Sequence, residues 1–185
     1  MITIGITGSI ASGKSTVANL IAKNKYPLFS ADKVVSELYK NNKFIKLLTK
    51  KFNLKKNKII KNQIMLIIEN KDKLRMLEDI IHPFVRKEMN IFLKTKKKIL
   101  VLEVPLLIES KLTEYFDIII FVNAKKKLRL KRYLKKHNNK KIFETLNKRQ
   151  LSPAIKKKIC DFSINNNYSL VILKKNVKKF IENYE

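Results

Sequence analysis

The chain has 185 residues, a single cysteine and a formal net charge of +27. Its length suits one domain that buries about 70% of the unfolded chain's surface. One cysteine, Cys160, excludes an internal disulfide and a cysteine-based metal site, so we expect a small core residue there. The sequence shows no signal peptide pattern and its apolar runs are too short to span a membrane, so we expect a cytoplasmic protein.

The positive charge comes mostly from lysine, since only five of the 42 basic residues are arginine. Lysine, isoleucine and asparagine are all abundant and have AT-rich codons, so an AT-rich genome would give this composition without any binding role. The lysines are also spread over most of the chain. A charge of this size suggests nucleic acid, but for these reasons we do not expect nucleic acid as the main partner. The charge should still attract anionic small molecules.

The N-terminal residues predict a strand, a glycine-rich loop and a helix, in that order. Residues 1–6 are apolar and β-branched, as in a buried strand. Residues 8–15, GSIASGKS, fit the pattern G-x-x-x-x-G-K-S/T of a phosphate-binding loop, and helical spacing follows over residues 14–23. The chain has three glycines, which we expect where the backbone turns or approaches a ligand closely: Gly5, Gly8 and Gly13.

The residue types of this loop suit the chemistry of phosphate. Successive backbone N–H groups and the start of the following helix form a concave anion site. Lys14 would reach the β- and γ-phosphates, and the Ser15 hydroxyl would ligate Mg²⁺. The predicted nucleotide-binding residues are Gly8, Ala11, Ser12, Gly13, Lys14, Ser15 and Thr16, and the predicted metal ligand is Ser15.

A second short strand is expected over residues 26–30, and helical spacing resumes at Val34. Asp32 therefore lies where the strand ends, and ligands of open α/β sheets bind beyond the carboxyl ends of the strands. The alternative is that Asp32 caps the next helix, which needs only an oxygen near free N–H groups. The local pattern alone favours the cap.

Lysine-rich residues 40–98 show helical periodicity without a clear strand, so an all-helical insertion is expected between strands. His82-Pro83 should break this run, because proline disfavours helical backbone at the residue before it and fits the first turn of a new helix. By itself, His82 would more often be a cap or a partly buried structural residue.

Residues 99–104 and 117–122 are strongly apolar strands, which indicates a parallel sheet covered on both faces. Glu103 lies near the end of the first of them, where an acid could meet a metal ion or its water shell. A last strand is expected near Leu170–Leu173, before a closing helix.

Residues 125–150 are dense in charge and predict a helical hairpin. One interpretation is a solvated hairpin, and the other is a basic lid that closes over nucleotide phosphates. Arg129 and Arg132 lie one turn apart on one helix face, where they would neutralise charge in the transition state. His137 is expected in a solvated loop.

These motifs together resemble the dephospho-CoA kinase family, in the family's order and over nearly the whole chain. Four positions depart from the family pattern: Ser30, Glu103 and Asn165 stand where the family has aspartate, and Tyr168 stands where it has glycine. The resemblance rests on the loop at 8–16, Ala31-Asp32, His82-Pro83, Val104-Pro105-Leu106-Leu107 with Glu109, Phe116-Asp117, Arg129-Leu130 with Arg132, Gln150, and Asp161 with Ile164 to Asn167.

The resemblance implies an α/β fold, a three-layer P-loop NTPase sandwich with a five-stranded parallel sheet. It divides the single domain into a core, a helical substrate region over residues 31–98 and a lid over residues 125–150. The core would consist of residues 1–30, 99–124 and 151–185.

The resemblance also implies a reaction, the transfer of the γ-phosphoryl group of ATP to the 3′-hydroxyl of dephospho-CoA with Mg²⁺. Asp32 would be the base or the orienting group for that hydroxyl, and His82 would lie near the substrate. The other implied catalytic residues are Lys14, Arg129 and Arg132.

Two other classes of function stay open at this stage. One is a different small-molecule kinase with the same loop, acting on a nucleoside, a nucleotide or a sugar-like alcohol. The other is an NTPase that binds nucleic acid or regulates another process, although the guanine-binding pattern N-K-x-D is missing from the sequence. We expect a monomer or weak oligomer with dephospho-CoA and ATP as partners and without a membrane partner.

Overall fold

The computed structural model describes residues 1–23, 25–55 and 59–184. The predicted core and helical region are therefore described except for residues 24, 56–58 and 185. The strands are β1 (Ile2–Gly8), β2 (Leu28–Ser30), β3 (Ile99–Glu103), β4 (Ile118–Asn123) and β5 (Phe162–Asn165). The α-helices are α1 (Lys14–Ala22), α2 (Ala31–Leu38), α3 (Asn42–Phe52), α4 (Ile60–Glu69), α5 (Lys71–Leu93), α6 (Lys126–His137), α7 (Lys140–Arg149), α8 (Pro153–Ile159) and α9 (Leu170–Ile181).

The described strands form one parallel sheet in the order β2-β3-β1-β4-β5, which confirms the predicted five-stranded parallel sheet. β1 lies at its centre, where Ile4 pairs with Val101 of β3 and with Ile118 of β4. At the carboxyl end of the sheet, Ser30 of β2 lies opposite Glu103 of β3. The register therefore brings two of the four positions that depart from the family pattern side by side.

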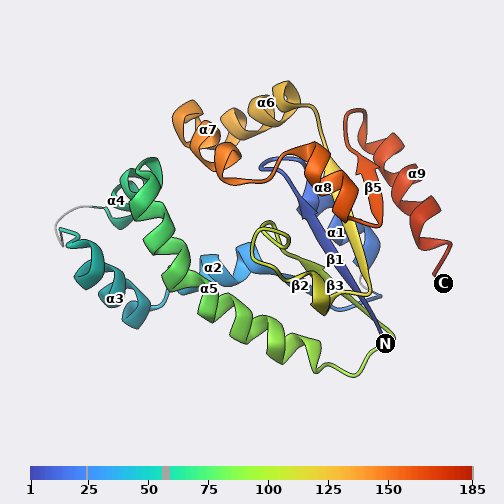
Figure 1. Ribbon diagram of the computed structural model, residues 1–185, viewed down its shortest axis with the longest axis horizontal. Helices are drawn as coiled ribbons and strands as arrows, with labels where there is room; N and C mark the ends of the chain where they lie inside the picture. Colours follow the sequence, from blue (N-terminus) through green and yellow to red (C-terminus); the bar gives the residue numbers. More distant parts are fainter. Residues whose placement is uncertain (24, 56–58, 185) are drawn as a thin grey trace.

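Helices cover both faces of the sheet, which confirms the three-layer sandwich (Figure 1). Strand β3 shows the division, since Ile99 and Val101 face a core with α1 and α9, whereas Leu100 and Leu102 face a core with α5. The two faces are both apolar because each is covered, as in other parallel sheets.

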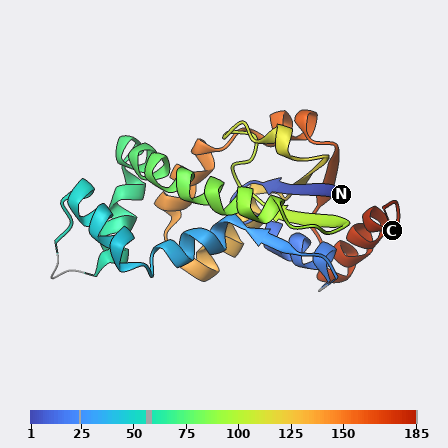
Figure 2. The same ribbon diagram turned by 90° about the horizontal axis from the view of Figure 1, so that it is seen from below.

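The region between β2 and β3 is helical and has a small core of its own, built on Phe44, Leu48, Ile64, Ile67 and Leu77. In both views, α3 and α4 extend beyond the sheet on the side away from the chain termini (Figure 2). Asparagine, which is abundant in this chain, is the N-cap of several helices. Its side-chain oxygen accepts hydrogen bonds from the free N–H groups of the first turn. These caps are Asn41 for α3, Asn70 for α5 and Asn139 for α7.

The expected break at His82-Pro83 is wrong, because α5 continues through Pro83 to Leu93. Proline inside a helix removes one backbone hydrogen bond and costs about 3 kcal/mol. Leu74 and Leu77 are buried before the proline and Met89 after it. Packing on both sides of Pro83 therefore outweighs the local preference to end the helix.

The expected last strand at Leu170–Leu173 is also wrong, because these residues open α9 and the fifth strand is β5. Ser169 caps the helix by accepting a hydrogen bond from the Ile172 N–H. Leu173 and Val177 start the buried face of α9 at helical spacing, while Leu170 to Ile172 are exposed. β5 was missed because it lies at the sheet edge, where only Ile164 of its four residues is buried.

Candidate active site

The loop between β1 and α1 has the conformation of a phosphate-binding nest. Gly13 has a φ angle of 97°, and a side chain there would also collide with the amide of Asn166. A Cβ at Gly8 would lie 2.6 Å from the backbone oxygen of Val122. Both positions therefore require glycine, one for its backbone angle and both for close packing. Ala11 also has a positive φ of 57°, which an alanine adopts at some cost.

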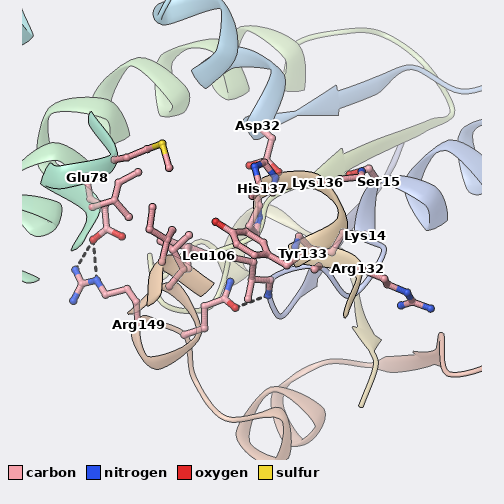
Figure 3. A pocket seen from close by; sticks show the side chains of 18 residues that line it. Lys14, Ser15, Asp32, Glu78, Leu106, Arg132, Tyr133, Lys136, His137 and Arg149 are labelled. Carbon is pink, nitrogen blue, oxygen red and sulfur yellow. Dashed lines mark hydrogen bonds and ion pairs between the residues drawn. The ribbon is translucent and has the colours of Figure 1, made fainter. Parts of the chain in front are cut away.

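A cavity of about 670 Å³ opens above this loop at the carboxyl ends of the strands. Figure 3 shows Lys14, Ser15 and Asp32 on one side of it and Glu78 with Arg149 on the other. Of the predicted nucleotide-binding residues, Ala11, Lys14 and Ser15 line this cavity. Gly8, Ser12 and Gly13 shape the loop beneath, and Thr16 is an exposed residue in the first turn of α1.

Lys14 is buried, with 8% of its surface exposed, and its Nζ donates a hydrogen bond to the Ser9 backbone oxygen at 3.3 Å. Burial lowers its pKa, and the charges of Asp32 and Glu103 oppose that shift. The two carboxylates thus help to keep the lysine charged at the bottom of the cavity, where a phosphate would bind.

A hydrogen-bonded group of oxygens lies beside Lys14. The Ser15 hydroxyl donates to Glu103 Oε1 at 2.6 Å, and the Ser30 hydroxyl donates to Glu103 Oε2 at 2.9 Å. Glu103 is buried, with 2% of its surface exposed. Hydroxyl and carboxylate oxygens are the ligand types that Mg²⁺ prefers, so this group fits the predicted metal. The described residues hold no cluster of three or more His, Cys, Asp or Glu side chains with the spacing of a metal site.

Asp32 does not cap α2, so the capping alternative is wrong. The cap is Ser30, whose hydroxyl accepts a hydrogen bond from the Lys33 N–H, and Asp32 lies in the first turn of the helix. Its side chain opens toward the cavity, yet the surrounding protein desolvates it enough to raise its pKa. Lys14 opposes this rise and Glu103 adds to it. Asp32 is therefore free for a role toward a ligand.

A second cavity, of about 390 Å³, lies between α2, α5 and the segment that follows β3. Its walls are mainly apolar, and His82 and Arg86 are among its few polar residues. Burial lowers the pKa of His82, which favours the neutral imidazole. Asp32 lines both cavities and so lies at their junction. Glu78, Pro105 and Leu106 also line both.

The two predicted lid arginines have different surroundings. Arg132 lines the first cavity and donates to the backbone oxygens of Ser12 and Asn166. In Figure 3 its side chain extends away from Asp32. Arg129 is not among the residues that line that cavity. Its guanidinium is buried and donates to the backbone oxygens of Ala124 and Ile10, as well as to the Asn147 side chain.

His137 is exposed, as expected, but it lies in a helix and not in a loop, which corrects that part of the sequence-based expectation. It is the last residue of α6, it lines the first cavity, and its ring stacks on Tyr133 with 4.6 Å between ring centroids. Sequence reasoning missed both residues as parts of the site. The i, i+4 spacing of Tyr133 and His137 was a usable signal, because such residues share a helix face.

The lid also contacts the helical region and the loop. Arg149 forms an ion pair with Glu78 of α5, with 2.6 Å between Nη2 and Oε2, and Lys141 pairs with Glu69 of α4 at 2.7 Å. Gln150, which follows α7, accepts a hydrogen bond from the Ile10 N–H at 2.7 Å. The sequence predicted neither ion pair, because the partners are about 70 residues apart along the chain.

Asn166 connects three parts of the site and was also missed as a site residue. Its amide nitrogen donates to the Ser12 backbone oxygen at 2.8 Å, and its backbone oxygen accepts from Arg132 at 3.0 Å. Its only sequence signal was its place in the late motif from Asp161 to Asn167.

A phosphate nest with a buried lysine, a neighbouring oxygen cluster and the basic helices α6 and α7 above them define the class of protein as a P-loop kinase. The two cavities share the carboxylates of Asp32 and Glu78, and a carboxylate between a nucleotide and an acceptor can orient the acceptor hydroxyl for phosphoryl transfer. Comparison with known proteins narrows the class. A family model described as dephospho-CoA kinase matches residues 2–171.

Two curated dephospho-CoA kinases are similar along their length. That of Bartonella quintana is 36% identical over 97% of this chain and 96% of its own, and that of Rickettsia typhi is 33% identical over 100% and 98%. The solved dephospho-CoA kinase from Campylobacter jejuni has a TM-score of 0.64 and 28% identity, over 97% of this chain and 95% of its own. The chain belongs to the dephospho-CoA kinase family and is an ATP-dependent kinase.

Proposed function

We propose that this chain transfers the γ-phosphoryl group of ATP to the 3′-hydroxyl of dephospho-CoA, giving coenzyme A and ADP. The observation that carries the proposal is the position of Asp32 between two unlike cavities. The first offers the phosphate nest and Lys14, which suit a nucleotide. The second is mainly apolar and suits an acceptor with a long, weakly polar arm.

In this proposal Asp32 orients the acceptor hydroxyl and takes its proton as phosphoryl transfer proceeds. Lys14 and the loop N–H groups stabilise charge on the transferred group. Arg132 lies nearer to this chemistry than Arg129, whose hydrogen bonds suit it to holding the lid and loop together. His82 lines the acceptor side, where its neutral ring would contact the substrate.

Ser15 and Glu103 would hold Mg²⁺, directly or through water, and the ion would supply charge neutralisation between the phosphates. A cytoplasmic location and a monomeric or weakly associated state also belong to this proposal. None of the described helices is long and apolar enough to cross a membrane.

A panel of acceptors tests the substrate. Each acceptor is incubated with ATP and Mg²⁺, ADP release is measured, and the product is identified by mass and by the position of its new phosphate. Dephospho-CoA should be the preferred acceptor, over free adenosine, shikimate and gluconate. A higher kcat/KM for one of the other acceptors would contradict the proposal, and ATP hydrolysis that no acceptor stimulates would favour an NTPase.

A further inference from the structure

The segment from Pro105 to Glu109 forms the wall between the nucleotide side and the acceptor side. Pro105 and Leu106 line both cavities. Their position therefore affects how an acceptor in one cavity meets a phosphoryl group in the other. The polar groups that hold this wall lie behind it and line neither cavity.

A wholly buried lysine lies behind this wall. Lys156 of α8 has 0% of its side chain exposed, and its Nζ lies 2.9 Å from Glu109 Oε1. The same Nζ donates to the Pro105 backbone oxygen at 3.4 Å. That oxygen also accepts a hydrogen bond from the hydroxyl of Thr7, one residue before the end of β1. The wall is thus fixed from α8 and from the central strand.

Glu109 also holds the end of the lid. Its Oε1 accepts a hydrogen bond from the Leu151 N–H at 2.9 Å. The neighbouring residue, Gln150, is bound to the Ile10 N–H of the phosphate loop. Two consecutive residues after α7 are therefore attached, one to the loop and one to Glu109. Lys156 lies close enough to Lys14 for its charge to lower the pKa of Lys14.

Stability alone is a weak reason for this ion pair. Replacing a buried pair with apolar side chains of similar volume often leaves stability unchanged or raises it. Moreover, Glu109 Oε2 is buried and has no hydrogen-bond partner among the described residues, which is unfavourable. An apolar pair would avoid that penalty but could not bind the Pro105 oxygen and the Leu151 N–H.

We propose that Lys156 and Glu109 are positioning residues for phosphoryl transfer, which hold the Pro105–Leu106 wall and the end of the lid at fixed places relative to the phosphate loop. This inference rests on the kinase function proposed above. Neither residue touches the reacting atoms. Their effect should therefore appear in kcat at saturating substrates, and the affinity of the loop for nucleotide should change little.

The double variant Lys156→Met/Glu109→Met separates positioning from stability. Both substitutions keep an unbranched side chain of similar length, and no buried charge is left unpaired. We expect a Tm within about 3 °C of wild type and a nucleotide Kd within about threefold, but a kcat lower by about tenfold or more, because small misplacement of reacting groups is costly. Glu109→Gln keeps an acceptor for Leu151 and for Lys156, so its kcat should stay within about threefold of wild type.

The matched control is Lys178→Met/Glu182→Met, the same two changes in an exposed ion pair on α9. It should leave kcat unchanged.

A kcat within about twofold of wild type in the buried double variant would overturn the inference, as would equal losses of kcat in that variant and in Glu109→Gln. If the double variant does not fold, Lys156→Met/Glu109→Gln, which also leaves no buried charge unpaired and keeps the acceptor for Leu151, is assayed and judged by the same kcat limit. If the wild-type protein prefers another acceptor of the panel, the kcat of each variant relative to wild type is measured with that acceptor. The positioning proposal can then be tested even if the proposed substrate is wrong.

Discussion

The phosphate side and the lid side of the site are held by different kinds of interaction. On the phosphate side, the loop backbone follows β1, and the buried side chains of Lys14 and Glu103 are held against the carboxyl ends of the strands. On the lid side, α7 reaches α5 through the ion pair of Arg149 with Glu78, in which the Arg149 side chain is 37% exposed. The first side is part of the core around the sheet. The second is joined to the helical region by ion pairs and by a small separate cluster, in which the buried Ile142 and Phe143 pack with Met65 and Ile68 of α4.

This difference indicates which side can move. Buried strands and the loop that follows β1 share the stability of the whole core, whereas elements joined by fewer buried contacts open at lower free energy. Partly exposed ion pairs add little stability and are screened by salt. We therefore expect substitutions on the phosphate side to change the chemical step, and those on the lid side to change binding and closure.

The largest expected effect tests Asp32, at the junction of the two sides. Asp32→Asn keeps the side chain's size, and Ser30 remains to cap α2. Loss of the base should lower kcat by about 10²- to 10⁴-fold, with nucleotide affinity largely kept. Because the pKa of Asp32 is raised in the folded chain, any stability from this group is lost as pH rises, so the substitution should not lower Tm at pH 7. A kcat within about threefold of wild type would contradict a catalytic role.

For the wild-type enzyme, the raised pKa of Asp32 also predicts a pH profile. As the pH is lowered, kcat should decrease with an apparent pKa above the ordinary aspartate value of about 3.9, because the base must be ionised to act. Steady-state rates at saturating substrates, measured across the acid range, locate this limb. A plateau that extends below the ordinary value would exclude Asp32 as the titrating base.

A somewhat smaller effect is expected for Lys14, within the phosphate side alone. Lys14→Met keeps the apolar stem and removes the charge, so kcat should fall by about 10²- to 10³-fold. Burial lowers the pKa of Lys14, which means that its charged form is disfavoured in the fold at neutral pH. Tm should therefore stay constant or rise. A fall in kcat that follows a fall in Tm would point instead to a structural role.

The pair of Ser30 and Glu103 offers a third test on the same side. Glu103→Asp shortens the carboxylate, so it should lose at least one of its hydroxyl partners, Ser15 or Ser30. Such a loss predicts a fall in kcat of about tenfold and a higher Mg²⁺ requirement. Adding Ser30→Asp restores the two aspartates of the family pattern and should recover most of the activity. Independent, additive losses in a double-mutant cycle would show that the two positions do not compensate each other.

Sequence reasoning was most successful on the phosphate side, for a physical reason. A backbone nest needs glycine at fixed places and a lysine after it, so its geometry can be read from one short segment that contains Gly8, Gly13 and Lys14. The central strands were also predictable, because burial on both faces makes them continuously apolar. β5 was missed because an edge strand carries a weak apolar pattern.

The lid side could not be predicted in the same detail. Its contacts join residues far apart in the sequence, and the abundance of lysine conceals which charges have partners. Arg129 and Arg132 look equivalent at i, i+3 spacing, yet only Arg132 lines the first cavity. The role of Ser30 as the cap of α2 was visible only in the structure, because Ser30 and Asp32 are both suitable capping residues.

The smallest expected effect concerns the contact between the lid and α5. Arg149→Met removes the ion pair with Glu78 but keeps much of the apolar stem. Because a partly exposed pair contributes little, we expect a rise of about threefold in the KM for the acceptor, with kcat almost unchanged. The rise should shrink at high salt, since screening already weakens the pair in wild type. The matched control is Lys141→Met, which removes the more exposed pair with Glu69 and should change KM less. A fall in kcat comparable to that of Lys14→Met would mean that Arg149 acts on the transferred group, and that the lid side shares directly in the chemistry.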